Sequence, residues 1–236
     1  GRTDEAERVV AEFESSAALS TRTHANETAR DNVPETPAND TQEATSIWSA
    51  PLRKRTLALC TVWFCINLSY YGAFIWIPSL LSAQGFSLVK SFAFTLIMTL
   101  AQLPGYAVAA YLIEKWGRRA TLAVFLAGSA GAAVCYGLSH SDFYIILSGC
   151  FLSFFNLGAW GALYAISPEV FPTRLRGTGT GTAAGLGRIA SILAPLIVPP
   201  LISFGGTGVL FAVFAAAFLL AAVTTFALPE KRGKSL

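Results

Sequence analysis

Six apolar stretches between Thr56 and Pro229 are each long enough to cross a lipid bilayer. A membrane-spanning helix needs about 20 consecutive, mostly apolar residues. The sequence predicts such helices over residues 57–83, 91–113, 120–138, 143–167, 177–202 and 208–228. Membrane strands would require a closed barrel with alternating polarity, and these stretches do not alternate. We therefore expect an all-α membrane protein with six transmembrane helices.

The positions of lysine and arginine predict how these helices are oriented. Cytoplasmic loops retain basic residues, whereas translocated loops do not. Lys90 is the only basic residue in one set of loops. The opposite set contains Arg53, Lys54, Arg55, Lys115, Arg118, Arg119, Arg174, Arg176, Lys231, Arg232 and Lys234. We expect a multi-pass protein of the cell (plasma) membrane with both ends of this chain in the cytoplasm.

Residues 1–50 differ in composition from the rest of the chain. They carry ten of the fourteen acidic residues, together with Pro34 and Pro37, and they offer little apolar surface to bury. This composition predicts a mostly disordered cytoplasmic segment. Residues 51–236 carry a net charge of +9, but the charge is spread over the loops. A nucleic-acid partner is therefore not expected.

The sequence offers no residues for a metal site, a cofactor or an enzyme active site. The four cysteines lie in apolar stretches without CxxC spacing, and His24 and His140 stand alone. The predicted spans contain no Asp, Glu or His group from which a catalytic site could be built. They also lack a carboxylate that could carry protons, so any coupling carboxylate would lie outside this chain.

Arg188 is the only formal charge inside a predicted span. It follows Gly177 by eleven residues, which places it about 16 Å deep in a hydrocarbon core of roughly 30 Å. A charge at this depth costs about 2.5 to 3.5 kcal/mol on insertion scales. Arg188 should therefore face a hydrated cavity, where it could bind an anionic substrate. Pairing with backbone carbonyls or helix ends is the structural alternative.

Amide and aromatic side chains recur at similar depth on three other spans. Such a set suits a planar organic anion, because the aromatic faces stack on its ring and the guanidinium donates two parallel hydrogen bonds to its carboxylate. Packing is the alternative role for each aromatic residue taken alone. Together with Arg188, the candidate substrate-binding residues are Asn67, Tyr70, Tyr71, Gln102, Asn156, Trp160 and Tyr164.

Glycines recur every fourth residue along the fifth predicted span, at Gly177, Gly181 and Gly185. Small residues at this spacing let two membrane helices approach closely. We expect this stripe to pack against another helix.

Three motifs lie in the predicted cytoplasmic gaps: EKWGRR at 114–119, PEVFPTRLRG at 168–177 and PEKRGKSL at 229–236. In this order and spacing they resemble the second half of the major facilitator superfamily, in its sugar-porter-like and organic-ion branches. The resemblance covers roughly residues 51–236. It implies the C-terminal half-bundle of a twelve-helix fold whose partner is a missing N-terminal six-helix half. Residues 1–50 would be the central loop.

Three further segments resemble bacterial niacin transporters of the metabolite and proton symporter group within that superfamily. They are SYYG at 69–72, LIMTLAQLPGY at 96–106 and FFNLGAWGALY at 154–164. In related organic-ion carriers, a basic residue at the position matching Arg188 goes with anionic substrates. The resemblance implies alternating-access transport of nicotinate or a similar aromatic carboxylate, with proton coupling as an option. A sugar or organic-cation porter, a non-transporting scaffold and a half-size homodimer remain alternatives.

The cytoplasmic motifs also contain candidate gating residues. We expect Glu114 and Glu169 to pair with basic residues when the inner side is closed, and to exchange or lose these partners when it opens. The candidate basic partners are Arg118, Arg119, Arg174 and Arg176. Loop anchoring and membrane topology are the alternative roles for these charges.

Overall fold

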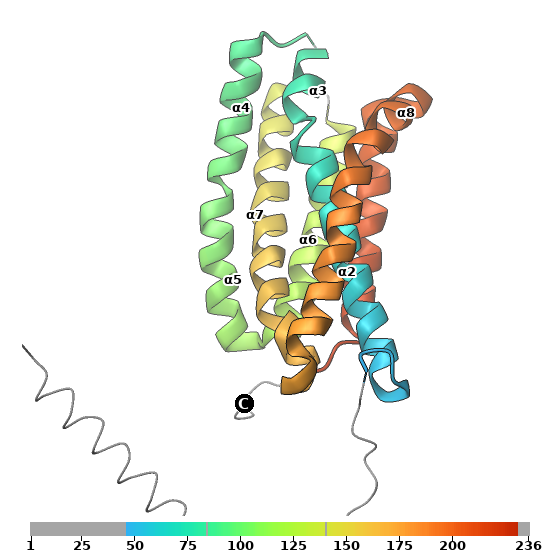
Figure 1. Cartoon of the computed structure of the whole chain (residues 1–236). Coiled ribbons are helices and arrows are strands. Elements are labelled where there is room, and N and C mark those ends of the chain that lie inside the picture. Colours follow the sequence, from blue (N-terminus) through green and yellow to red (C-terminus); the bar gives the residue numbers. More distant parts are fainter. Residues whose placement is uncertain (1–45, 84, 140, 231–236) are drawn as a thin grey trace, which may run out of the picture. The chain divides into compact units, whose positions relative to one another are not determined.

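Figure 1 shows a computed structural model of the chain, which describes residues 46–83, 85–139 and 141–230. Within these residues every regular element is a helix, as the apolar stretches predict. Most of the segment 1–50 lies outside the described residues, so its disorder and cytoplasmic location stay predictions.

The helices cross the bundle six times. Within the described ranges, five helical segments are long and apolar enough to span a membrane, and the last one folds back on itself. In chain order the elements are α2 (Ala50–Phe74), α3 (Ile77–Ala83), α4 (Leu88–Leu100), α5 (Gln102–Trp116), α6 (Arg118–Leu138), α7 (Asp142–Ile166), the short 3-10 helices η1 (Ser167–Val170) and η2 (Thr173–Leu175), and α8 (Arg176–Thr225).

The fold-back divides α8 into a first arm, residues 176–204, and a second arm, residues 207–225, which lie alongside each other in Figure 1. Gly205 and Gly206 between them have non-helical backbone torsions. The φ angle of Gly206 is +68°, which side chains with a Cβ rarely adopt. The two arms correspond to the predicted spans 177–202 and 208–228.

Two prolines interrupt spans that the sequence predicts as continuous. A proline ring clashes with the carbonyl four residues earlier and cannot donate a helical hydrogen bond. Phe74 precedes Pro78 by four residues and ends α2, while Leu100 precedes Pro104 by four and ends α4. The predicted helix 57–83 is therefore α2 plus α3, and 91–113 is α4 plus α5.

Close packing of small residues against phenylalanine rings holds the bundle together. Helix α2 packs against both arms of α8, while α6 packs between α7 and α8. A Cβ added at Gly72 would meet the buried Phe214 ring, and one at Gly158 would meet the buried Phe125 ring. In lipid such contacts replace the hydrophobic effect as the force between helices.

The stripe of Gly177, Gly181 and Gly185 does not pack in this way, and the prediction for it is wrong within the described bundle. All three are exposed, and a Cβ at each would find no atom within 4 Å. The parallel stripe two residues later faces the bundle instead, with Gly179 against Phe171 and Gly187 against Asn67. Two residues correspond to about 200° of helix rotation, which places the two stripes on opposite faces.

Helices α4 and α5 are the least covered part of the bundle. Only 22% of the most apolar window in Leu88–Trp116 is buried, and Leu96, Leu100 and Leu103 are exposed. An exposed apolar face of this size meets lipid or another protein surface.

We predict that Gly158→Ala destabilises the bundle because the new methyl group overlaps the Phe125 ring. Overpacking a core of this kind typically costs about 1 to 3 kcal/mol. The check is the midpoint of thermal unfolding in detergent micelles. Gly131→Ala is the matched control, since it is also a mid-helix glycine but has open space at its Cβ. Equal midpoints for the two variants would contradict the packing argument.

Candidate functional site

An aromatic cluster, defined as Trp63, Tyr70, Trp160 and Tyr164, lies where α2 crosses α7. The Trp63 ring meets the Trp160 ring edge to face at a centroid distance of 5.6 Å and the Tyr164 ring at 5.2 Å. Trp160 stacks on Tyr164 at 5.6 Å and contacts Tyr70 at 6.0 Å. Tyr164 remains 53% exposed. The cluster is thus a continuous aromatic surface that is open on one side.

Arg188 lies on an exposed face of the first arm of α8. Its Nη1 donates a hydrogen bond to the hydroxyl of Tyr71 at 3.1 Å. The Tyr71 ring in turn packs edge to face on Tyr70 at 5.3 Å, which connects the guanidinium to the aromatic cluster. Among the described residues, no carboxylate pairs with Arg188. The charge is therefore neither sealed against backbone nor neutralised within this part of the chain.

Asn67 connects α2 to α8 in the interior of the bundle. Its Nδ2 donates to the Trp63 carbonyl at 2.8 Å, and its Oδ1 accepts from the Ser191 hydroxyl at 2.9 Å. The side chain is 1% exposed. In this conformation the Asn67 amide is satisfied by the protein and positions α2, rather than facing the open surface.

Asn156 and the indole nitrogen of Trp160 have buried polar atoms without partners. Neither amide atom of Asn156 nor Nε1 of Trp160 makes a hydrogen bond to a described residue. The two residues are four positions apart on α7 and share one face. Buried polar groups are nearly always satisfied by protein, water or ligand. These atoms are therefore available to a bound molecule or to ordered water.

Gln102 at the start of α5 extends the site to a fourth helix. Its side chain is buried and lies near the Tyr70 side chain. All the sequence-predicted substrate-binding residues thus lie on α2, α5, α7 and the first arm of α8. Arg188 and Tyr164 are exposed and Tyr70 and Tyr71 are half-buried, whereas the enclosed members of the site are Trp63, Asn67, Gln102, Asn156 and Trp160.

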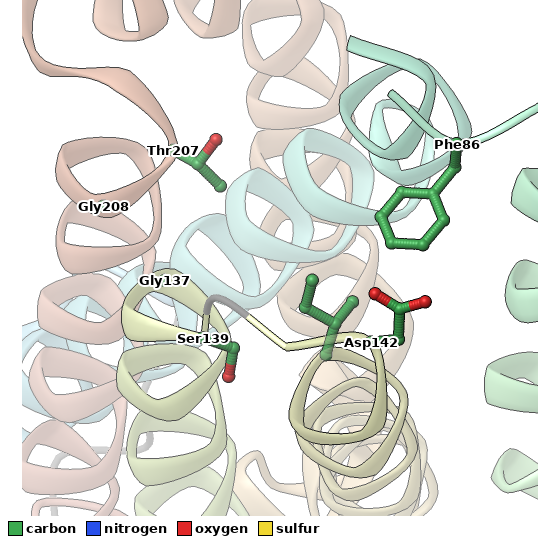
Figure 2. Close-up of a pocket in the computed structure, with 7 residues that line it drawn as sticks. Phe86, Gly137, Ser139, Asp142, Thr207 and Gly208 are labelled. Atoms are coloured by element: carbon green, nitrogen blue, oxygen red, sulfur yellow. The ribbon is translucent and has the colours of Figure 1, made fainter. Parts of the chain in front are cut away.

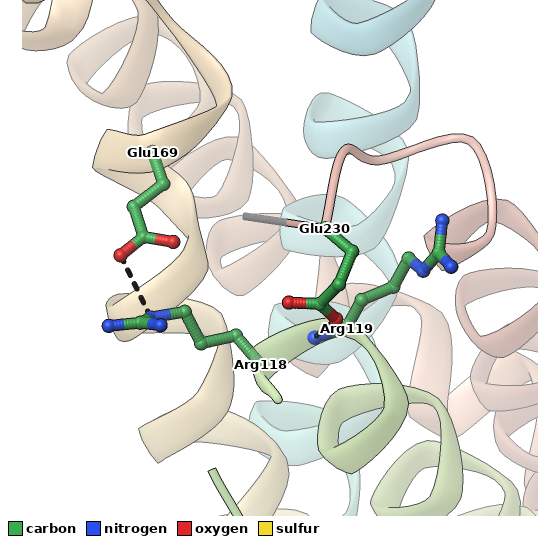
Figure 3. A network of polar contacts seen from close by, with 4 residues as sticks. All are labelled: Arg118, Arg119, Glu169 and Glu230. Atoms are coloured by element: carbon green, nitrogen blue, oxygen red, sulfur yellow. Dashed lines mark hydrogen bonds and ion pairs between the residues drawn. The ribbon is translucent and has the colours of Figure 1, made fainter. Parts of the chain in front are cut away.

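At one end of the bundle, Glu169 of η1 pairs with Arg118 of α6 (Figure 3). Arg118 Nε lies 2.8 Å from Glu169 Oε1. This Nε–H is not directed along the contact, so the interaction is mainly charge attraction rather than an aligned hydrogen bond. One of the expected acid–base contacts is therefore present in this conformation, and its role in gating stays a prediction.

Glu230 joins the same end of the bundle, and the sequence analysis missed it. Its Oε2 accepts the backbone N–H of Arg119 at 3.1 Å, while Arg119 Nη1 donates to the Leu228 carbonyl at 3.3 Å (Figure 3). Gly117 at the helix start has no side chain that could cap α6, and a Cβ at this position would come within 3.0 Å of the Glu230 carboxylate. Glu230 thus caps the N-terminus of α6 from a position far away in the sequence. Its negative charge also interacts favourably with the helix dipole.

The other candidate gating residues are not engaged in this way. Among the described residues Glu114 is exposed and has no ion-pair partner. Arg174 is exposed, and the buried Nε of Arg176 has no hydrogen-bond partner. Of the charges proposed for the gate, only Arg118, Arg119 and Glu169 make tertiary polar contacts within the described residues.

A cavity of about 470 Å³ opens at the other end of the bundle (Figure 2). The Phe86 ring and the Asp142 carboxylate face each other across it, and Thr207 lies at the turn between the arms of α8. None of the predicted substrate-binding or gating residues lines this cavity. In the described part of the chain, no group of three or more His, Cys, Asp or Glu residues could hold a metal ion.

Comparison with known proteins gives one family and several relatives. A family model described as "Sugar (and other) transporter" matches residues 1–236. The putative niacin/nicotinamide transporter NiaP of Bacillus subtilis is 50% identical over 180 residues, which cover 75% of this chain and 44% of that protein. The niacin transporter NiaP of Acinetobacter baylyi is 42% identical over 240 residues, which cover 100% of this chain and 53% of that protein.

A more distant relative is solute carrier family 22 member 15 of Xenopus tropicalis. It is 33% identical over 193 residues, which cover 77% of this chain and 34% of that protein. The chain spans about half the length of the two bacterial relatives.

We predict that Glu230→Ala destabilises the start of α6 by about 0.5 to 2 kcal/mol, the usual cost of losing an N-terminal cap. The measurement is the thermal unfolding midpoint in detergent micelles, supported by hydrogen exchange of the first amides of α6. Glu114→Ala is the control, because it removes the same charge from an exposed position that has no ion-pair partner in the described part of the chain. If both variants unfold at the same temperature, the capping role is wrong.

Proposed function

The chain belongs to the sugar and other transporter family of the major facilitator superfamily, and from this premise we propose that it supplies the C-terminal six-helix half of a secondary transporter. Two features support this proposal. The chain spans about half the length of its bacterial relatives, and the face containing α4 and α5 is largely uncovered. An N-terminal half would cover that face, and the two halves would rock around a site near the middle of the bilayer.

The transported solute is nicotinate or a similar aromatic carboxylate. The observation that carries this proposal is the Arg188 guanidinium, which has no carboxylate partner in the described residues and lies beside the aromatic cluster through Tyr71. The two NiaP relatives are named as niacin transporters, which points to the same class of solute.

Different side chains of the site would bind different parts of such a solute. Guanidinium has five N–H donors, and Tyr71 occupies one direction, so others remain for a forked contact with a carboxylate. Tyr164, whose side chain is 53% exposed, offers a ring face on which an aromatic acid can stack, and the buried Trp160 packs behind it. The amide of Asn156 is buried and has no partner among the described residues, so it provides a donor and an acceptor only to a molecule that enters the interior of the bundle.

The Arg118–Glu169 ion pair stabilises one conformational state of the transporter. It connects the start of α6 to η1 and is partly buried, since the side chains of Arg118 and Glu169 are 30% and 11% exposed. Partly buried charges are screened less than surface charges, so this contact can shift the populations of two nearly isoenergetic states. The distribution of basic residues favours a cytoplasmic location for this end of the bundle, and we propose the plasma membrane as the location of the protein.

In this function the chain moves its solute across the membrane without changing it chemically. The four described acidic residues, Glu114, Asp142, Glu169 and Glu230, lie at the ends of the helices. If transport is coupled to protons, the coupling carboxylate lies in the N-terminal half.

Labelled uptake by the complete transporter tests the role of Arg188. We predict that Arg188→Ala raises the KM for nicotinate by roughly 10- to 150-fold, since a hydrogen bond to a charged group contributes about 1.5 to 3 kcal/mol. Arg188→Lys should rank between wild type and Arg188→Ala because it keeps the charge but loses the fork. Tyr71→Phe is the control that leaves the charge intact and should have a smaller effect.

A normal KM in the Arg188→Ala variant would defeat the anion contact. Competition by glucose or a quaternary amine, with none by nicotinate, would favour a sugar or organic-cation porter instead.

A double-mutant cycle tests the role of the Arg118–Glu169 pair in transport. We predict that Glu169→Gln and Arg118→Gln each change the turnover of nicotinate uptake while leaving membrane insertion intact. The double variant should resemble either single variant, because residues that act as a pair are not additive. Additive effects, or unchanged uptake kinetics in both single variants, would remove the pair from the mechanism.

A further inference from the structure

An apolar groove of about 500 Å³ runs along the outside of the bundle between α2 and both arms of α8. Leu57 and Leu220 at its rim are 51% and 54% exposed, so the groove opens outward. None of its residues belongs to the aromatic cluster or to the Arg118–Glu169 pair. The lining residues are Leu57, Cys60, Thr61, Phe64, Cys65, Leu68, Leu186, Ala216, Ala217 and Leu220.

The length of the groove matches one leaflet of a bilayer. Along α2 it extends from Leu57 to Leu68, which is about 16 Å at the helical rise. Half of a hydrocarbon core of roughly 30 Å is about 15 Å. A membrane-spanning helix of a partner protein would need a groove of twice this length, whereas the acyl chain of a lipid fits a groove of this length.

Cationic side chains lie immediately beyond the end of the groove. Arg53 and Lys54 precede Leu57 by four and three residues on α2, so they flank the same helix face. Arg53, Lys54 and the adjacent Arg55 are all exposed. Among the described residues none of the three has an ion-pair partner.

No described carboxylate competes for this positive charge. The first turn of α2 contains no acidic residue. Glu169 contacts Arg118, and Glu230 contacts the backbone of Arg119. Asp142 begins α7 at the other end of the bundle. Within the described residues, Arg53 and Lys54 therefore have no carboxylate partner, and they lie where the polar headgroups of one leaflet would lie.

We propose that this groove is a binding site for an anionic phospholipid. One acyl chain lies along Leu57 to Leu68, and the phosphate lies between Arg53 and Lys54. Two interactions favour binding of the lipid at this site. The acyl chain is buried against apolar side chains, and basic residues near the membrane surface attract the headgroup. It is separate from the substrate site, so it bears on how lipid composition affects the transporter.

Native mass spectrometry of the complete transporter in detergent tests this site, with phosphatidylglycerol and phosphatidylcholine added in turn. We expect wild type to retain phosphatidylglycerol in preference to phosphatidylcholine. In Arg53→Gln/Lys54→Gln the affinity for phosphatidylglycerol should fall by roughly 30-fold, which corresponds to about 1 kcal/mol for each basic residue. Nicotinate uptake is measured separately, so failure of the lipid site is distinguishable from failure of the proposed transport function.

Two matched variants make the test specific. Lys115→Gln/Arg174→Gln removes two exposed charges from the same end of the bundle but away from the groove, and it should retain the lipid. Ala216→Phe fills the groove from an exposed position and should release the lipid with every charge in place. Thermal unfolding midpoints verify that each variant is folded.

Three results would overturn the proposal. They are equal retention of the two lipids by wild type, equal losses in the two double charge variants, and a protein rather than a lipid bound at the groove.

Discussion

A guanidinium inside a helical segment that is apolar enough to span a membrane is the constraint on which the candidate site depends. The insertion cost of such a charge is tolerated only where water, a polar partner or a ligand reaches it. Here the hydroxyl of Tyr71 is the one direct partner, and no carboxylate in the described residues neutralises the charge. The aromatic cluster beside it offers ring faces, so the same surface combines a free positive charge with a stacking platform.

The scaffold around this surface depends on where helices stop. Pro78 and Pro104 end α2 and α4 four residues upstream, and Gly205 with Gly206 turns α8 back on itself. The glycine turn makes α8 cross the bundle twice, whereas each proline break lies within a single crossing. Gly72 and Gly158 then let phenylalanine rings approach the opposing helix backbone, which is how helices associate where lipid competes for every apolar side chain.

Charged residues at the ends of the bundle fall into three groups. Glu230 is a structural cap, because it satisfies the start of α6 where Gly117 cannot. The Arg118–Glu169 contact connects two segments by charge attraction, and its exchange during gating stays a prediction. Arg53 and Lys54 have no described protein partner, and they point to the lipid as their counterpart. A basic residue near the membrane surface can therefore serve the fold, the conformational equilibrium or the bilayer.

The sequence by itself determined the helical class and the approximate spans, because these follow from local apolar length and the fixed rise of a helix. The depth of Arg188 in the bilayer stays a prediction. The structure added the interruptions at Pro78 and Pro104, in spans that the sequence predicts as continuous. Only the tertiary structure decided which face of each helix turns inward. The two small-residue stripes on the first arm of α8 have the same spacing, and only the one containing Gly179 and Gly187 packs inside. Likewise, the Asn67–Ser191 and Arg119–Glu230 contacts join residues more than 100 positions apart, and a local pattern carries no information about such pairs.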